Sequence, residues 1–441
     1  MRPVKRTILF ATEYWAPFAP GGAEWTNVAW AEALARRGHR VVVVTPNYGA
    51  EPREERDGVL VVRAPIARKL DAGREARWLA HRNPRFHARL ARWIRRVARA
   101  EGAELIHAQS RGTVVGARRA ARALGLPLAV TIRDLGLLCP VGACPLFEPW
   151  TTFDCSTRQY VTRCVPFFLR HYAAGDGPLR RARRWAALLA GWIDHGVQRR
   201  ALASADLVLG VSRGILDAFP PALVNRRRAH VVHIYSLPPD VSGVTETPDA
   251  VRRRLGIGDG PLVLCAGKRS LGKGTDVFLE AMDAIRAASP RVRFVFAGKG
   301  EIAPPARDDV HVLGSVPQST LFALYRAAAV VAVPSVWPEP LSRVLLEAMR
   351  FGRAVVATRV GGSPELVEDG VTGLLVPPRD PDALAGAVVA LLRDPARCAR
   401  LGAAAANRTV TELDEGRLVT ELLDAYERVL ARGPAMQRRP A

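Results

Sequence analysis

A glycine-rich segment of the C-terminal half carries two cationic side chains at a spacing that suits an anion. Residues 267–274 read GKRSLGKG, with Lys268 and Lys273 five positions apart, although the chain has only five lysines among 64 basic residues. The segment follows an expected strand and precedes an expected helix, whose N-terminus adds partial positive charge. Glycine lets the backbone approach a ligand closely. The pattern therefore predicts a site for a diphosphate.

Two other interpretations of this segment stay open at the level of the residues. The segment matches most of the phosphate-binding P-loop pattern, but Gly274 occupies the position of the required Ser or Thr, and Thr275 comes one residue late. The other alternative is an ordinary Gly-rich turn with solvated lysines, because short Gly-rich motifs are weak evidence when they stand alone.

Two glutamates flank the start of an expected helix over residues 341–351. Glu339 lies just outside this helix and can reach the hydroxyl groups of a ligand, whereas Glu347 lies in its second turn and can accept hydrogen bonds from a vicinal diol such as a ribose. Together with the backbone amides between them, these carboxylates would recognise a nucleotide sugar; the alternative is an amphipathic helix with two solvated glutamates. The amides available to an anion at the helix start belong to Ser342, Arg343 and Val344.

The same residues resemble a known family, the family 4 glycosyltransferases. Residues 339–358 read EPLSRVLLEAMRFGRAVVAT, which is similar to the family pattern EPFG-x3-LEAMA-xG-xPVVAT. GKRSLGKG resembles the family segment GRLSPEKG, with Lys268 in the Arg position and Lys273 in the Lys position. Three further segments match in the correct order along nearly the whole chain: PGGAE at 20–24, ELIHAQS at 104–110 and GGSPELVEDGVTGLLVP at 361–377.

The resemblance implies a GT-B fold, a retaining glycosyltransferase and a UDP- or GDP-linked sugar as donor, with no metal or other cofactor required. Gly21 and Gly22 would approach the donor diphosphate, the two lysines would neutralise charge on the leaving diphosphate, Glu339 would hold the sugar and Glu347 the ribose. The implied donor-binding residues are Gly21, Gly22, Lys268, Lys273, Ser342, Arg343, Val344 and Glu347, and the implied catalytic residues are Glu339, Lys273, Lys268 and Arg133.

Three positions depart from the family pattern. Arg133 stands where a T-x-H-D motif carries its histidine, Gln109 replaces a second histidine, and Ser342 replaces a glycine. An arginine stays protonated and cannot act as a base, but it can bind a phosphate or a sugar oxygen. We interpret Arg133 and Asp134 as a variant of the family motif, with an inactive remnant as the alternative.

The elements that must position these residues alternate between strand and helix in two series. Runs such as 40–45 and 330–333 predict buried strands of parallel sheets that helices cover on both faces. A loop-like stretch separates the series, so we expect an N-terminal acceptor-binding domain over 1–240 and a C-terminal nucleotide-sugar-binding domain over 241–441, whose terminal helix packs back on the first. The predicted fold class is α/β, with two doubly wound Rossmann-like domains that face a central cleft.

Length and composition exclude several classes of protein. A chain of 441 residues, 49% of them apolar, fits two domains of about 200 residues each. No apolar run reaches the roughly 20 residues that a membrane-spanning helix needs. The N-terminus lacks the long apolar stretch of a secretory signal, which predicts a cytoplasmic protein.

The formal net charge is +22, and residues 1–250 hold 38 basic against 21 acidic residues, a difference of +17. Basic amphipathic helices at 85–99 and 179–197 contribute to this excess. Such helices cover a sheet with a solvated basic face, or they lie on an anionic membrane surface, here the inner face of the plasma membrane, where the acceptor would be a lipid-linked sugar. Because no nucleic-acid-binding motif occurs, nucleic acid is not expected as a partner.

Four of the six cysteines lie within 26 residues, at Cys139, Cys144, Cys155 and Cys164. Four thiolates could hold a structural zinc ion, but the spacing lacks the tight C-x2-C pairs of ordinary zinc sites, so free thiols or a local disulfide are the alternatives. We expect this segment to be a long loop that shapes the acceptor pocket.

The sequence thus favours a retaining glycosyltransferase that takes part in polysaccharide biosynthesis or modifies a small metabolite. It would act on a glycan, a lipid-linked sugar or a small-molecule acceptor. Two other hypotheses remain: a nucleotide-sugar epimerase or hydrolase of the same fold, and a non-catalytic nucleotide-sugar-binding protein. Product analysis with labelled donor and no acceptor separates the first from transfer, and binding without turnover identifies the second.

Overall fold

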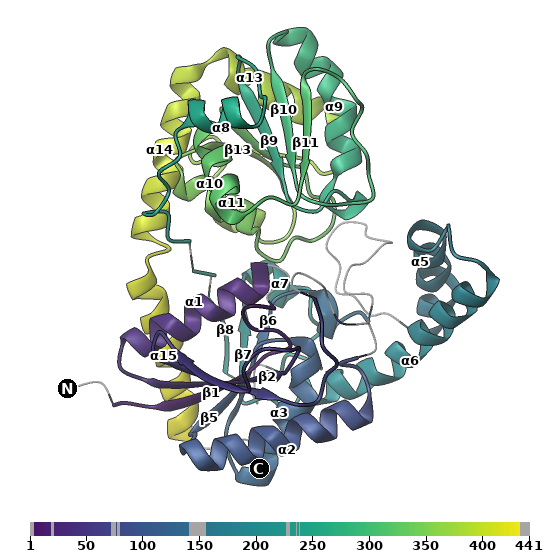
Figure 1. Cartoon of the computed structure of the whole chain (residues 1–441), viewed down its shortest axis with the longest axis vertical. Coiled ribbons are helices and arrows are strands. Elements are labelled where there is room, and N and C mark those ends of the chain that lie inside the picture. Colours follow the sequence, from purple (N-terminus) through teal and green to yellow (C-terminus); the bar gives the residue numbers. More distant parts are fainter. Residues whose placement is uncertain are drawn as a thin grey trace. The chain divides into compact units, whose positions relative to one another are not determined.

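The chain folds as two compact units, the first formed by Met1–Leu237 together with Glu415–Ala441 and the second by Pro238–Asp414 (Figure 1). Each unit is built on one mostly parallel sheet, which confirms the predicted α/β class with two Rossmann-like domains. The computed structural model describes residues 4–18, 22–71, 76, 80–140, 156–225, 230–234, 236–237 and 239–432.

The first unit contains an eight-stranded sheet in the order β3-β4-β2-β1-β5-β6-β7-β8. Neighbouring strands are parallel except β3 and β4, which pair antiparallel at one edge. The central strands are runs of buried aliphatic residues, as parallel sheets covered on both faces require. The strands are β1 Thr7–Ala11, β2 Arg40–Pro46, β3 Arg53–Arg56, β4 Val59–Ala64, β5 Leu105–Ala108, β6 Leu128–Ile132, β7 Leu207–Gly210 and β8 His230–His233.

The last helix of the chain belongs to the first unit. It buries Leu418, Leu422 and Tyr426 in the same hydrophobic core as β1, β2 and α1. Arg6 adds an ion pair to Glu427 at 2.7 Å. The α-helices of this unit are α1 Gly22–Arg36, α2 Pro84–Glu101, α3 Arg111–Leu124, α4 Thr157–Gln159, α5 Val165–Tyr172, α6 Pro178–Leu202, α7 Arg213–Asp217 and α15 Glu415–Arg432, with a 3-10 turn at Leu135–Leu137 and a π-helical turn at Tyr160–Cys164.

The two basic amphipathic helices have different surroundings. Helix α2 buries its apolar stripe, including Phe86, Leu90 and Ile94, and therefore covers the sheet with its arginines outward. Helix α6 and α5 share a small separate core and extend from the sheet as an arm (Figure 1). On α6, Leu188 is buried in that core, whereas Ile193 is 73% exposed.

The second unit contains a six-stranded sheet in the order β11-β10-β9-β12-β13-β14, and all its neighbouring strands are parallel. Its strands are β9 Leu262–Ala266, β10 Arg293–Ala297, β11 Val310–Gly314, β12 Val330–Val333, β13 Ala354–Thr358 and β14 Leu374–Val376. Its α-helices are α8 Pro248–Arg254, α9 Thr275–Ala288, α10 Gln318–Ala327, α11 Arg343–Arg350, α12 Ser363–Leu366, α13 Pro381–Arg393 and α14 Pro395–Thr411, with a 3-10 turn at Leu271–Lys273.

Helix α11 begins two residues later than the sequence predicts. Ser342 is its N-cap and accepts a hydrogen bond from Leu345 N at 3.4 Å. A serine at this position satisfies one of the amides that a helix start leaves without a partner. Leu341 therefore belongs to the loop after β12, and the helix start lies close to Glu339 in sequence.

Candidate active site

The loops after β9 and β12 meet at the carboxyl edge of the second unit's sheet, because these two strands are parallel neighbours. Val336 N and Trp337 N both donate to Gly272 O, at 2.9 and 3.1 Å. Gly274 has φ +67°, and a Cβ there would lie 1.8 Å from Pro334 O, so only glycine fits. This backbone contact brings the glycine-rich segment and Glu339 to one place.

Glu339 and Lys273 form the central polar contact of this edge. Glu339 is 6% exposed, and its Oε2 accepts from Lys273 Nζ at 2.5 Å and from Ser335 Oγ and Trp337 Nε1 at 3.1 Å. Burial favours the neutral acid, but Lys273 and these donors outweigh it and lower the pKa of Glu339 below its ordinary value. The carboxylate is therefore ionised at neutral pH.

The second oxygen of Glu339 is left for a ligand. Among the residues that the structure describes, all hydrogen bonds of this carboxylate use Oε2, and Oε1 has no hydrogen-bond partner. The backbone behind it is fixed by the glycine pair after β13: Gly362 N donates to Glu339 O at 2.8 Å, and a Cβ on Gly361 would lie 1.9 Å from the same oxygen. The Gly-Gly motif thus supports the position of Glu339.

Glu347 is held inside the second unit rather than solvated. It is 5% exposed; Tyr325 OH donates to its Oε2 and Arg343 Nη2 to its Oε1, both at 3.0 Å. Burial and this carboxylate raise the pKa of Tyr325 well above its ordinary value, so the phenol stays a donor. The interpretation of both glutamates as solvated helix residues is therefore wrong.

The two lysines of the glycine-rich segment differ in their surroundings. The Lys268 side chain is 63% exposed and lies 3.6 Å from Glu301, whereas Lys273 contacts Glu339 and lies over the Trp337 ring at 5.3 Å. Thr275 is buried, and its Oγ1 accepts from Ser270 N at 3.1 Å. Its hydroxyl thus serves the loop, which disfavours the P-loop interpretation.

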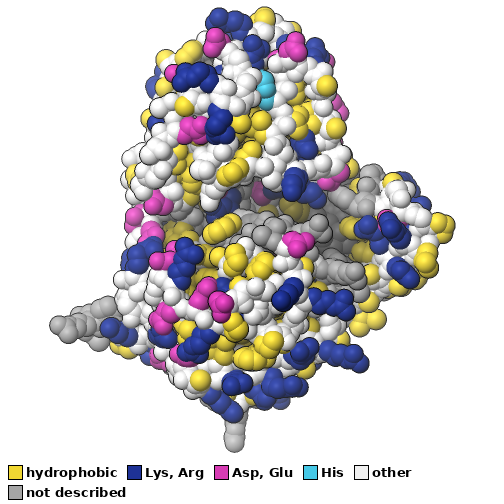
Figure 2. Space-filling view, viewed as in Figure 1, with side chains coloured by type: hydrophobic (Ala, Val, Ile, Leu, Met, Phe, Trp, Pro, Cys, Tyr) yellow, Lys and Arg dark blue, Asp and Glu magenta, His cyan; other side chains and the backbone are white. Residues whose placement is uncertain are grey.

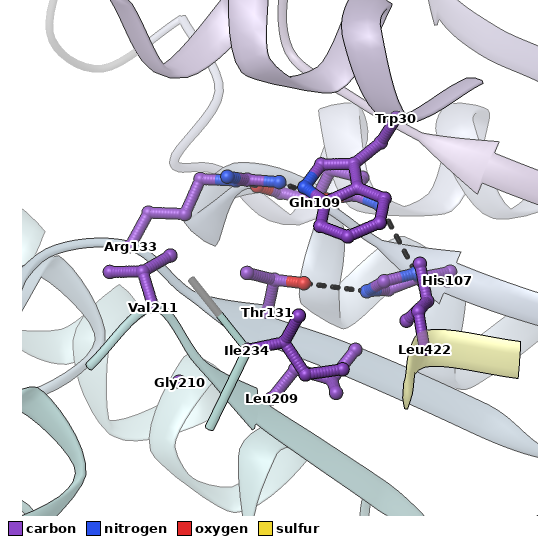
Figure 3. Close-up of a pocket in the computed structure, with 10 residues that line it drawn as sticks. All are labelled: Trp30, His107, Gln109, Thr131, Arg133, Leu209, Gly210, Val211, Ile234 and Leu422. Carbon is purple, nitrogen blue, oxygen red and sulfur yellow. Dashed lines mark hydrogen bonds between the residues drawn. The ribbon is translucent and has the colours of Figure 1, made fainter. Parts of the chain in front are cut away.

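In the first unit the residues after β5 and β6 form a second polar group. Arg133 Nη2 donates to Gln109 Oε1 at 2.6 Å and its Nε to Gln109 O at 3.3 Å. These residues line a pocket of about 300 Å³, open solvent included, together with His107, Thr131 and apolar side chains of α1, β7 and α15 (Figure 3). Gly22 begins α1, whereas Gly21 lies outside the described residues.

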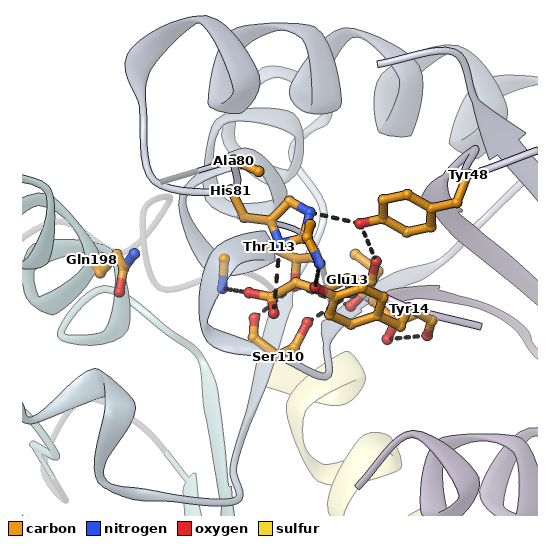
Figure 4. Close-up of polar contacts among 12 residues, drawn as sticks. Glu13, Tyr14, Tyr48, Ala80, His81, Ser110, Thr113 and Gln198 are labelled. Atoms are coloured by element: carbon orange, nitrogen blue, oxygen red, sulfur yellow. Dashed lines mark hydrogen bonds and ion pairs between the residues drawn. The ribbon is translucent and has the colours of Figure 1, made fainter. Parts of the chain in front are cut away.

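Sequence reasoning missed a polar cluster at the end of β1 (Figure 4). Glu13 Oε1 accepts from Gly112 N at 2.5 Å and so caps α3, and its Oε2 lies 3.8 Å from His81 Nδ1. Tyr48 OH contacts both Glu13 O, at 3.0 Å, and His81 Nε2, at 2.6 Å. Burial lowers the pKa of His81. A glutamate directly after a buried strand was the signal that could have found this cluster.

The predicted cysteine site is described only in part. Cys139 and Cys164 are buried, and Cys144 and Cys155 lie outside the described residues. Within the described ranges no group of three or more potential metal ligands occurs. No helix of the described chain is both long enough and apolar enough to cross a membrane.

Comparison with known proteins gives a consistent assignment. Residues 260–394 match a family model described as glycosyl transferases group 1, and residues 21–235 match a glycosyl transferase 4-like domain. The D-inositol 3-phosphate glycosyltransferase of Xylanimonas cellulosilytica is 38% identical over 263 residues, which cover 54% of this chain and 60% of that protein. The alpha-maltose-1-phosphate synthase of Mycolicibacterium smegmatis is 31% identical over 290 residues, covering 57% of this chain and 72% of that protein.

A solved Anabaena protein, HepE in complex with UDP-glucose, has the same fold with a TM-score of 0.63 and 20% identity, over 96% of this chain and 99% of the other. The chain therefore belongs to the family 4, group 1 glycosyltransferases with the GT-B fold. It is a glycosyltransferase by family, as the residue-level resemblance predicted. The match to the first relative spans only 60% of that protein's length.

Proposed function

We propose that the chain is a retaining glycosyltransferase that moves a sugar from a UDP- or GDP-linked donor to a glycan, lipid-linked or small-molecule acceptor. The observation that carries this proposal is the buried, ionised Glu339, whose Oε2 is held by Lys273 while Oε1 stays open. Likeness to a protein solved with UDP-glucose supports a nucleotide sugar as the donor. The second unit would bind this donor and the first the acceptor.

Each candidate site residue of the second unit then has a chemical role. Glu339 Oε1 accepts hydrogen bonds from the donor sugar's hydroxyls, since an ionised carboxylate can only accept. Lys273 and the exposed Lys268 neutralise charge that develops on the leaving diphosphate. The amides at the start of α11, from Ser342 to Val344, bind phosphate oxygens, and Glu347 binds the ribose. From the first unit, Gly21 and Gly22 approach the diphosphate.

Transfer with retention needs no nucleophile from the protein in this scheme. The bond between the sugar's anomeric carbon and the diphosphate oxygen breaks, and the acceptor oxygen bonds to the same face of that carbon. The departing phosphate oxygen takes the proton of the acceptor hydroxyl. The protein contributes electrostatic stabilisation and positioning, which are large terms in catalysis.

A thermal-shift screen with UDP- and GDP-linked sugars tests the proposal. A ligand at 100 times its Kd stabilises the fold by about 2.7 kcal/mol, so a true donor should raise Tm clearly. Lys273→Ala should abolish this shift. Labelled donor without acceptor should give little free or epimerised sugar. Absence of any shift and of any transfer across the donors would contradict the proposal.

We also propose that the arm of α5 and α6 contacts an anionic membrane surface on the cytoplasmic side. Leu179 and Trp185 are 65% and 45% exposed on α6. Exposed arginines surround them, and Figure 2 shows Lys and Arg side chains beside hydrophobic ones on this arm. Exposed tryptophan among arginines suits the interface of an anionic bilayer. The arginines are Arg180, Arg181, Arg183 and Arg184.

Replacing both Leu179 and Trp185 with Ser should weaken binding to vesicles of phosphatidylglycerol by about a hundredfold or more, because roughly 1.5–3 kcal/mol of apolar transfer is lost for each of the two large side chains. Vesicle co-sedimentation measures the loss. Vesicles of phosphatidylcholine should bind neither protein. Trp93→Ser changes a half-buried tryptophan on α2, outside the arm, and as the matched control should leave vesicle binding unchanged. Equal binding of all three proteins would argue against the arm as the contact.

A further inference from the structure

The two histidine replacements in the first unit, Gln109 and Arg133, contact each other. Arg133 donates two hydrogen bonds to Gln109, one to the side-chain oxygen at 2.6 Å and one to the backbone oxygen at 3.3 Å. The residues follow neighbouring strands, β5 and β6, at the carboxyl edge of the sheet. A histidine at position 109 would offer no amide oxygen there. The two departures therefore form one structural unit.

The orientation of Gln109 is fixed from behind. Arg133 can only donate, so the amide oxygen of Gln109 faces Arg133 and the amide nitrogen faces His107 Nδ1, at 3.1 Å. Nδ1 of His107 must then accept this hydrogen bond, so the ring proton lies on Nε2. The Nε2–H group donates to Thr131 Oγ1 at 2.6 Å. Tyr426 OH of α15 contacts the same Nδ1 at 2.7 Å. Figure 3 shows the side chains of β5 and β6 in this chain of contacts.

All these partners are neutral, so they do not balance the charge of Arg133. Burial lowers the pKa of His107 well below its ordinary value, and the nearby Arg133 adds to this effect. In the described part of the chain Arg133 has no ion pair. Burial lowers the pKa of Arg133 to about 10, although Glu24, Tyr426 and Asp134 act in the opposite direction. Arg133 is therefore a partly buried guanidinium without an ion pair among the described residues, an arrangement that costs free energy unless an anion binds to it.

The pocket beside Arg133 supplies the surroundings that strengthen an ionic contact. The other walls of the pocket are apolar. They are formed by Trp30 of α1, Leu209 and Val211 at β7, Ile234 after β8, and Leu422 of α15. Charges attract more strongly where water and its high dielectric constant are excluded. The planar fork of a guanidinium matches two oxygens of one phosphate or carboxylate.

We propose that Arg133 is a preset binding group for an oxyanion of the substrate, either a phosphate or a carboxylate, and that Gln109 is its positioning residue. The oxyanion belongs either to the donor diphosphate or to a carboxylate on the transferred sugar. The inference rests on the proposed function for its choice of nucleotide probes, but not for the chemistry of the group bound.

Calorimetry with UDP, UDP-glucose and UDP-glucuronic acid tests the proposal on the full chain. Arg133→Gln should weaken binding at least tenfold for every probe that carries the oxyanion that Arg133 binds: all three if it is the diphosphate, and UDP-glucuronic acid alone if it is the sugar carboxylate. Gln109→Glu should do the same with Arg133 intact, because a carboxylate at position 109 pairs with the guanidinium and competes with the ligand. Gln159→Glu, which adds the same charge on α4, should leave affinity within about twofold of wild type, the size of a surface-charge effect.

The pattern of losses identifies the source of the oxyanion. Equal losses for all three probes assign it to the diphosphate, and a loss confined to UDP-glucuronic acid assigns it to the sugar carboxylate. The double variant of Arg133→Gln with Gln109→Glu should bind no worse than Arg133→Gln alone. This non-additivity separates a positioning role from general damage to the fold, which would add a second loss.

A nucleotide-free measurement keeps the inference separable from the proposed function. The NMR signal of Arg133 Nε–H, assigned by its absence in Arg133→Lys, should move on titration with inorganic pyrophosphate or with glucuronate. Movement supports the inference even if no nucleotide sugar binds. A signal that both anions leave in place, together with unchanged affinities in Arg133→Gln and Gln109→Glu, would overturn it.

Discussion

Glu339→Gln should reduce kcat for sugar transfer by about 10²–10³-fold, the size of effect seen when one preorganised polar contact is removed from an active site. Three donors face Oε2 of Glu339, so the glutamine oxygen would occupy that side. The NH2 group would then face the donor sugar and present hydrogens where hydroxyl groups need an acceptor. Steady-state kinetics with the donor identified by thermal shift measures the loss.

The fold should survive this substitution, because the side chains have nearly the same shape and Lys273 keeps a hydrogen-bond acceptor. Circular dichroism and Tm should stay close to wild type. Glu301→Gln is the matched control: the Glu301 side chain is also at this sheet edge, is 40% exposed and, within the described residues, forms an ion pair with the exposed Lys268 alone, at 3.6 Å. It should transfer sugar at nearly the wild-type rate. Full activity in Glu339→Gln would refute the role given to this carboxylate.

Gly274→Ala should lower the free energy of unfolding by about 2–5 kcal/mol. Roughly 1–2 kcal/mol comes from an L-residue in the left-handed region, and about 1–3 kcal/mol from moving neighbours that a new methyl group would overlap. The overlap is with the backbone oxygen of Pro334, at 1.8 Å, so no flexible side chain can yield. The loop after β12 would have to shift, and Lys273 would lose its contact with Glu339.

Gly256→Ala isolates the backbone part of this effect. Gly256 has φ +66°, against +67° for Gly274, and a Cβ there meets nothing within 4 Å. It should lower the free energy of unfolding by only about 1–2 kcal/mol, the effect of an L-residue at positive φ in an otherwise open position. Urea unfolding of the two variants gives the comparison. Equal destabilisation would mean that the close approach of the two loops does not contribute to stability.

Local sequence patterns predicted the strands that carry the candidate active site of the second unit well. The run at 330–333 matches β12 residue for residue, and β9 ends at Ala266, directly before the glycine-rich segment, as expected. Buried parallel strands are short, apolar and bounded by turn residues, so their ends are visible in the sequence. The antiparallel pair β3 and β4 was missed, because β3 reads REER, an exposed edge strand without an apolar alternation.

The contacts within the sites were less accessible to sequence reasoning. Lys273 and Glu339 were assigned to separate parts of the ligand, yet they form an ion pair across 66 positions, because β9 and β12 are neighbours in the sheet. Strand order is a tertiary property that local periodicity does not carry. For the same reason the contact between Gln109 and Arg133 could not be inferred, although both residues were recognised as departures from the family pattern.

The position of α15 has a consequence for the order of events during synthesis. The second unit is complete in sequence at Asp414, whereas the first unit needs Leu418, Leu422 and Tyr426 to fill its core. During synthesis, all residues of the second unit therefore leave the ribosome before the first unit can complete its hydrophobic core. Until α15 emerges, the apolar surface of the nascent first unit that this helix covers, including Trp30 and Ile234, stays open to chaperones.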